Sequence, residues 1–78
     1  MENITNQVLK LVRDLTESDD VQLTTNLLDE GILDSLTTIE LITKLEDEFQ
    51  INIDSEDLNH QNFNTVANIE ALVKKIIG

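Results

Sequence analysis

Ser35 is the residue of this chain best placed to carry chemistry. Asp34 and Ser35 stand directly before a run in which apolar residues recur at helical spacing, and an Asp-Ser pair in that position usually caps a helix. The reciprocal capping box is absent, because Thr38 rather than Glu or Gln stands three residues after Ser35. The sequence therefore predicts an exposed serine at the N-terminus of a helix.

Ser35 has no partner in the sequence that would make it a catalytic nucleophile. The only histidine, His60, has no sequence context that marks it as a base for Ser35. Residues 33–37 do not form the Gly-x-Ser-x-Gly turn of hydrolases. The run Asp-Glu-Gly-Ile-Leu-Asp at 29–34 lacks the alternating ligands of a calcium loop. We expect no catalytic residue and no metal site, so another protein must supply any chemistry at Ser35.

The charge of the chain favours a basic protein as partner. Sixteen acidic and five basic residues give a net charge of -11 over 78 residues, which argues against nucleic acid and anionic membranes as partners. No apolar stretch approaches the roughly 20 residues that span a bilayer, and the N-terminus lacks the pattern of a signal peptide. We expect a cytoplasmic monomer that forms one small domain over residues 1–78, without disulfides because it has no cysteine.

Apolar residues at helical spacing predict three amphipathic helices, over residues 3–15, 35–50 and 66–77. A short fourth element is expected at 55–59. Thr65 suits the N-cap of the last long helix. No segment alternates convincingly as a strand. The predicted fold class is all-α, a four-helix bundle with three main helices and one short helix.

The connection over residues 16–34 is long for a structureless loop, but its composition predicts that it packs along the bundle. Its apolar side chains are Val21, Leu23, Leu27, Leu28, Ile32 and Leu33. Gly31 is expected to take the tight turn that leads to the helix beginning near Ser35.

The helix over residues 35–50 carries apolar side chains on two faces. At about 100° per residue, the core stripe contains Leu41, Ile42, Leu45 and Phe49, with Thr38 among them. Leu36 lies almost opposite this stripe and Ile39 well off its edge. Their outer neighbours are Glu40, Thr43, Glu46 and Asp47. Single exposed apolar residues are common, and the crossover or the short helix could cover Ile39. The apolar pair, the acids and the adjacent serine together predict a docking surface for a partner protein.

The whole arrangement resembles the acyl and peptidyl carrier protein family. The motif is Asp34-Ser35-Leu36, continued by Thr38-Ile39-Glu40-Leu41, by Leu45-Glu46-Asp47-Glu48-Phe49 and by the late segment Phe63-Asn64-Thr65-Val66. The resemblance covers essentially the whole chain, including its length, helix order, acidic charge and long first crossover. The run at 31–35, Gly-Ile-Leu-Asp-Ser, is more similar to D-alanyl carrier proteins and to specialised stand-alone carriers than to fatty-acid carriers.

The resemblance implies a carrier without catalysis of its own, in which Ser35 bears a 4′-phosphopantetheine arm. A phosphopantetheinyl transferase would attach the arm from coenzyme A through a phosphodiester, and Asp34 would help to hold magnesium in that complex. The thiol of the arm would hold an acyl or aminoacyl group as a thioester. A ligase or adenylation enzyme would load this group, and downstream acyl-accepting enzymes would take it. The phosphodiester would meet the positive end of the helix dipole.

The alternative to a carrier is an adaptor protein. A non-covalent acidic adaptor could bind a basic partner through the same helix and never receive an arm. Ser35 in its motif separates the two classes, because an adaptor would not need this serine. For a carrier, the cargo is left open between fatty acyl, aminoacyl such as D-alanyl, and polyketide groups.

Overall fold

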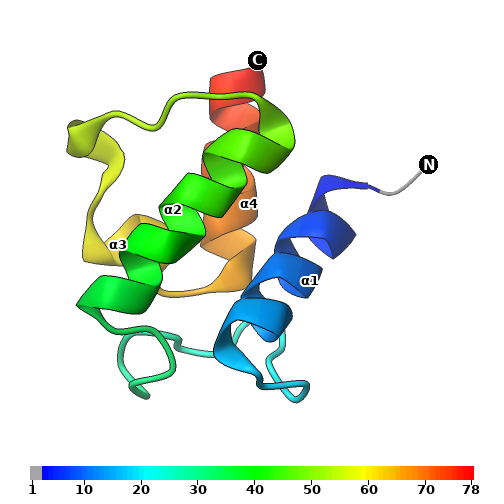
Figure 1. Cartoon of the computed structure of the whole chain (residues 1–78), viewed down its shortest axis with the longest axis vertical. Helices are drawn as coiled ribbons and strands as arrows, with labels where there is room; N and C mark the ends of the chain where they lie inside the picture. The colour runs from blue at the N-terminus through cyan, green and yellow to red at the C-terminus, as the bar shows by residue number, and fades with distance from the viewer. Residues whose placement is uncertain (1–2) are drawn as a thin grey trace.

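Four α-helices and one 3₁₀ turn make up the fold in residues 3–78, which are the residues that the computed structural model describes. In chain order they are α1 (Ile4–Thr16), α2 (Ser35–Phe49), the 3₁₀ turn η1 (Ser55–Asp57), α3 (His60–Phe63) and α4 (Val66–Ile77) (Figure 1). Residues 3–78 contain no strand, so the predicted all-α class is confirmed. Among these residues, no helix has the length and apolar character needed to cross a bilayer.

The short element predicted at 55–59 corresponds to the 3₁₀ turn η1, which ends at Asp57, and a further short helix, α3, begins at His60. Leu58 and Asn59 lie between the two elements. Asn59 has an extended backbone, and its side-chain oxygen accepts a hydrogen bond from the backbone N–H of Asn62 at 2.9 Å. Asn in this position is a favoured N-cap, so it marks the start of α3.

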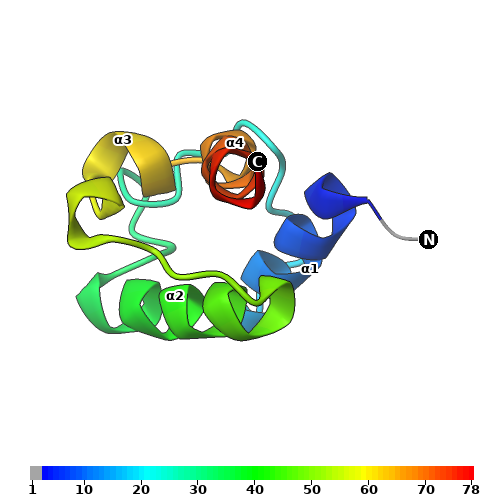
Figure 2. The ribbon, with the colours of Figure 1, turned by 90° about the horizontal axis from the view of Figure 1, so that it is seen from above.

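The core lies between the three long helices. The fully buried side chains of these three helices are Val8 and Val12 of α1, Leu41 and Leu45 of α2, and Val66, Ile69 and Val73 of α4. Phe63 of α3 is buried with them. Figure 2 shows α3 and α4 opposite α2, with α1 at one side of the molecule, next to both α4 and α2. The predicted stripe of α2 is confirmed, since Leu41 and Leu45 are buried and Ile42 and Phe49 pack partly buried against the core.

The crossover between α1 and α2 packs along the bundle, as predicted, with one exception. Val21, Leu27 and Leu33 are buried in the core. Leu23 was expected to join them, but its side chain is 38% exposed. It contributes through its backbone instead, because its carbonyl accepts a hydrogen bond from the N–H of Ala67 at 3.1 Å. Gly31 takes the predicted turn, with a φ of +74° that favours glycine.

Asn64 ties this crossover to the short segment between α3 and α4. Its backbone carbonyl accepts the N–H of Leu27 at 2.6 Å. Its side-chain oxygen accepts the N–H of Leu28 at 3.1 Å and that of Asp29 at 3.3 Å. One side chain therefore holds the part of the crossover that leads into α2.

Candidate functional site

Asp34, not Ser35, caps α2. Asp34 has an extended backbone, and its carboxylate accepts a hydrogen bond from the backbone N–H of Thr37 at 2.8 Å. Its carbonyl accepts the N–H of Thr38 at 2.9 Å. Ser35 is the first helical residue and is exposed. The N-cap of α2 is thus Asp34, one residue before Ser35, and the hydroxyl of Ser35 does not cap the helix.

The same hydrogen bonds keep Asp34 charged. The backbone N–H of Thr37, and then its hydroxyl, hold the pKa of the Asp34 carboxyl below its ordinary value. A carboxylate at a helix N-terminus is further favoured by the helix dipole. An exposed negative charge therefore stands directly beside Ser35 at neutral pH.

The apolar pair on the outer face of α2 is exposed as predicted. Leu36 is 67% and Ile39 61% exposed. Around them Glu40, Thr43 and Asp47 are also exposed.

Glu46, the fourth polar residue predicted beside this pair, is partly buried. Its carboxylate accepts the backbone N–H of Ile53 at 2.8 Å and so holds the loop after α2. The sequence could not reveal this bond, because the two residues are neighbours only after the chain has turned back.

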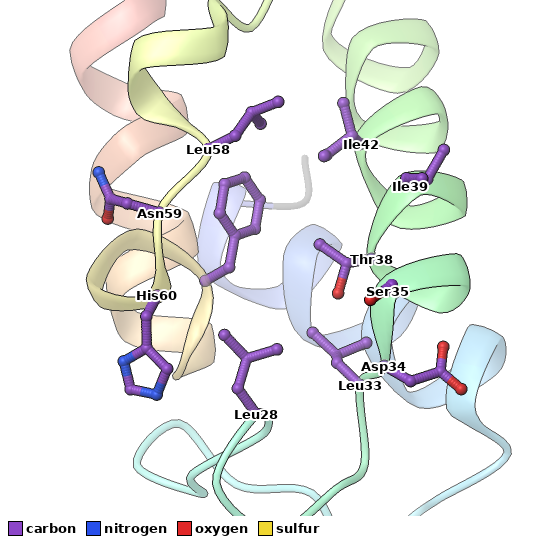
Figure 3. Close-up of a pocket in the computed structure, with 11 residues that line it drawn as sticks. Leu28, Leu33, Asp34, Ser35, Thr38, Ile39, Ile42, Leu58, Asn59 and His60 are labelled. Atoms are coloured by element: carbon purple, nitrogen blue, oxygen red, sulfur yellow. The ribbon is translucent and has the colours of Figure 1, made fainter.

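A pocket of about 530 Å³ opens beside Ser35, between α2 and the segment that enters α3. Its α2 wall includes Ser35, Thr38, Ile39 and Ile42, and the facing wall includes Leu58, Asn59 and His60 (Figure 3). Phe63 of α3 also lines the pocket. Leu28, Leu33 and Asp34 complete the lining. Most of these side chains are apolar. Of the α2 residues, the sequence predicted Ser35 and Ile39 as site residues, whereas it assigned Thr38 and Ile42 to the core stripe. It predicted nothing of the facing wall, whose elements are too short to show a periodic pattern.

Thr38 carries the one buried side-chain oxygen or nitrogen in residues 3–78 that has no hydrogen-bond partner. Threonine hydroxyls in helices often bond to the carbonyl four residues earlier, as Thr43 does to Ile39 at 3.2 Å and Thr16 to Val12 at 2.6 Å. The hydroxyl of Thr38 does not. The pocket wall next to Ser35 therefore contains an unpaired polar group.

His60 is joined to Asp29 across the end of the pocket. The His60 Nε2 atom lies 2.8 Å from a carboxylate oxygen of Asp29, and both side chains are more than half exposed. Asn64 donates to the other oxygen of Asp29 at 3.2 Å. This pair links α3 to the crossover and gives His60 a structural partner. His60 and Ser35 both line the pocket, but the His60 ring is hydrogen-bonded to Asp29 and not to the Ser35 hydroxyl.

These features decide what the site can do chemically. No group of three or more His, Cys, Asp or Glu side chains in the described part of the chain is arranged to hold a metal ion. An exposed hydroxyl on the first residue of a helix, beside an open pocket, suits the attachment of a group through a phosphodiester. The helix N-terminus would stabilise its negative charge, and the pocket offers the attached group an apolar wall.

Comparison with known proteins shows the family to which the chain belongs. The sequence pattern of the family described as "Phosphopantetheine attachment site" matches residues 6–73. The chain belongs to this family. It is 36% identical to the D-alanyl carrier protein of Lacticaseibacillus rhamnosus over 76 residues. This match covers 95% of this chain and 94% of the relative.

Solved structures show the same fold. The carrier is similar to a glycylated carrier protein complexed with the glycine:[carrier protein] ligase of Bradyrhizobium japonicum, with 28% identity, a TM-score of 0.73, and coverage of 90% of this chain and 99% of that one. A chain in the crystal structure of an FAD-dependent dehydrogenase is also similar, with 32% identity, a TM-score of 0.76, and coverage of 85% and 96%.

Family membership confirms the carrier function predicted from the sequence. The chain holds an acyl or aminoacyl group as a thioester on a covalently attached 4′-phosphopantetheine arm and presents it to partner enzymes. It is not itself an enzyme.

Proposed function

We propose that Ser35 is the attachment site of the arm and that the cargo is a small aminoacyl group. The attachment at Ser35 is supported by the arrangement at the start of α2, where Asp34 forms the N-cap and Ser35 is exposed beside the pocket. The D-alanyl carrier relative and the glycylated carrier in its ligase complex support the second part. The loading partner is then an aminoacyl-loading ligase.

Asp34 serves the attachment reaction as well as the helix. Its carboxylate is exposed and kept ionised by the hydrogen bonds from Thr37. In the complex with a phosphopantetheinyl transferase it would bind the magnesium ion that accompanies coenzyme A. Carboxylate oxygens are ligands that this ion prefers.

Recognition by partner enzymes uses the outer face of α2. Leu36 and Ile39 form its apolar centre, with Glu40, Thr43 and Asp47 around them and Glu46 at its C-terminal end. Buried apolar contact supplies affinity, and rim charges speed encounter with a basic partner. A cytoplasmic, monomeric carrier with downstream acyl-accepting partners stays a prediction.

Mass spectrometry tests the attachment site. The wild-type protein, incubated with coenzyme A, magnesium and a phosphopantetheinyl transferase of broad specificity, should gain the mass of one arm. Ser35→Ala should gain none, whereas Ser55→Ala, at an exposed serine of η1, should react like the wild type. Modification of Ser35→Ala would refute the assignment of Ser35. An unmodified wild type would instead favour the non-covalent adaptor.

The cargo is tested on protein isolated from its native source. Hydroxylamine cleaves thioesters, so the group that it releases from the arm can be identified by mass. An aminoacyl group would support the proposal. A saturated fatty acyl group would overturn the aminoacyl cargo and leave the attachment site at Ser35 intact.

The docking surface is tested with two leucines of α2. Leu36→Ala should lower the kcat/KM of arm transfer by roughly tenfold or more, because one leucine side chain contributes about 1.5–3 kcal/mol when it is buried. Its melting temperature should barely change. Leu45→Ala, which removes a fully buried side chain, should cost about 2–5 kcal/mol of stability. If Leu36→Ala destabilises the fold as much as Leu45→Ala, Leu36 belongs to the core and not to a docking surface.

A further inference from the structure

Asn64 lies in the short link between α3 and α4, yet all parts of this residue bond to the crossover before α2. Its two oxygens accept the backbone N–H groups of residues 27–29, as described above. Its side-chain nitrogen donates to the side-chain oxygens of Asn26 at 3.4 Å and of Asp29 at 3.2 Å. The Asn64 amide is therefore used on both its oxygen and its nitrogen to hold one stretch of the crossover.

The stretch that Asn64 holds is a closed loop over residues 26–33. Three backbone hydrogen bonds close it, from the N–H of Glu30 to the carbonyl of Asn26 at 2.9 Å, from Gly31 to Leu28 at 3.2 Å and from Leu33 to Leu27 at 3.0 Å. Leu33 is buried in the core, and the two residues after it are Asp34 and Ser35. A displacement of the loop would therefore reach Ser35 through very little chain.

The first turn of α2 has few contacts of its own that fix the Ser35 hydroxyl. Ser35 and Leu36 are exposed, and the buried residues of the helix begin only at Leu41. The first N–H groups of a helix have no partner within the helix. Asp34, which accepts one of them, is itself the residue that follows the loop. The orientation of Ser35 thus depends on the loop as well as on the packing of α2.

We propose that Asn64 is a positioning residue for attachment of the arm. It holds the loop over residues 26–33, and through this loop it fixes the direction in which the Ser35 hydroxyl is presented to the transferase. The inference rests on the proposed attachment at Ser35 and adds a residue that is distant from it in sequence. Asn64 acts through the loop and not through a bond to Ser35.

The chemistry of attachment makes this orientation matter. The Ser35 oxygen forms a bond to the β-phosphorus of coenzyme A, and the bond between that phosphorus and the oxygen that bridges the two phosphates breaks. Adenosine 3′,5′-bisphosphate leaves, and the transferase takes the serine proton. The attacking and leaving oxygens must lie roughly in line, so a hydroxyl held in the wrong direction slows the step even when the carrier is bound.

Steady-state kinetics of arm transfer test the proposal, with coenzyme A, magnesium and a phosphopantetheinyl transferase of broad specificity. Asn64→Ala removes the oxygen that accepts the N–H groups of Leu28 and Asp29. It should lower kcat roughly tenfold, because small misplacements of reacting groups are costly. The KM for the carrier should stay within about twofold, since uniform binding is not affected. Amide hydrogen exchange at Leu28, Asp29 and Leu33 should become faster.

Asn68→Ala is the matched control. The Asn68 side chain also makes a hydrogen bond between elements, to the carbonyl of Gln61 at 2.8 Å, but this bond joins α4 to α3 and does not reach the crossover. The variant should keep kcat within about twofold of the wild type, whatever its melting temperature. All rates are measured at a temperature at which circular dichroism shows the variants folded.

Each result decides a different point. If Asn64→Ala lowers kcat no more than Asn68→Ala does, or raises KM with kcat unchanged, Asn64 is not a positioning residue while Ser35 remains the attachment site. Should Asn64→Ala not fold, Asn64→Gln takes its place with the same expected loss of kcat, because it keeps the amide but moves it by one methylene group. A wild-type protein that gains no arm contradicts the attachment at Ser35 itself.

Discussion

At the scale of single residues, Asp34 caps α2 and its neighbour Ser35 presents an exposed hydroxyl, whereas a serine N-cap would use its hydroxyl for capping. Asp34 takes the N–H of Thr37 and caps α2, and Ser35 is left exposed. We predict that Asp34→Ala lowers the free energy of unfolding by about 0.5–2 kcal/mol, whereas Ser35→Ala leaves it nearly unchanged. Urea titration of both variants measures the difference. A larger loss in Ser35→Ala would show that its hydroxyl is part of the cap.

Asp34→Asn separates the two tasks of this residue. Asparagine caps helices about as well as aspartate, but it lacks the charge that would bind magnesium. The variant should keep its stability and react more slowly with the transferase. Equal losses in both measurements would mean that Asp34 acts only through the helix.

Thr38 offers a second prediction at this scale. Its hydroxyl is buried without a partner, and an unsatisfied buried group costs about 1–3 kcal/mol. Thr38→Val should therefore raise the free energy of unfolding by an amount within that range. Thr43→Val is the control, because that hydroxyl is exposed and bonded to the carbonyl of Ile39. If Thr38→Val is destabilising, the hydroxyl has a partner in solution.

At the scale of elements, side-chain hydrogen bonds join the short segments to one another and to α2. Asn64 and the pair of Asp29 with His60 join the crossover to α3, while Glu46 holds the loop after α2 through Ile53. These contacts fix the wall of the pocket that faces α2. Elements too short to be stable alone are thus placed by side-chain hydrogen bonds and, for α3, by the buried side chain of Phe63.

Acid should weaken the hydrogen bonds that join Asp29 to His60 and Asn64. The hydrogen bond from His60, and then that from Asn64, lower the pKa of the Asp29 carboxyl from its ordinary 3.8. A carboxyl whose pKa is lower in the folded than in the unfolded state stabilises the fold at pH values above its unfolded-state pKa. This stabilisation is lost as the pH falls through the folded-state pKa. The wild type should therefore lose more stability than Asp29→Asn between about pH 5 and pH 2. Urea titrations at several pH values measure this, and parallel curves would contradict it.

At the scale of the whole molecule, charge sets both the partners and the stability. The net charge of -11 favours basic partners but makes the acids of the folded chain repel one another. Salt screens such repulsion to a reach of about 10 Å at 0.1 M. We predict that sodium chloride raises the melting temperature at pH 7 and has much less effect near the isoelectric point. A flat or falling melting temperature at pH 7 would show that self-repulsion is a minor contribution.

The sequence by itself determined the features that depend on near neighbours along the chain. Apolar spacing predicted the three long helices, the buried Leu41 and Leu45, and the exposed Leu36 and Ile39, because residues three or four apart share one face of a helix wherever it packs. Thr65 was also recognised as an N-cap, and it accepts the N–H of Asn68 at 3.1 Å. Capping is equally local.

Only the tertiary structure decided which distant residues meet. Asp29 and His60 are 31 positions apart and 2.8 Å apart in space, and nothing in either segment predicts the pair. The pocket arises in the same way, because its facing wall comes from η1, α3 and the residues between them, which are too short to show a periodic pattern. Local periodicity thus places side chains on the faces of helices, whereas the opposing wall of the site depends on the contacts that form when the chain folds back on itself.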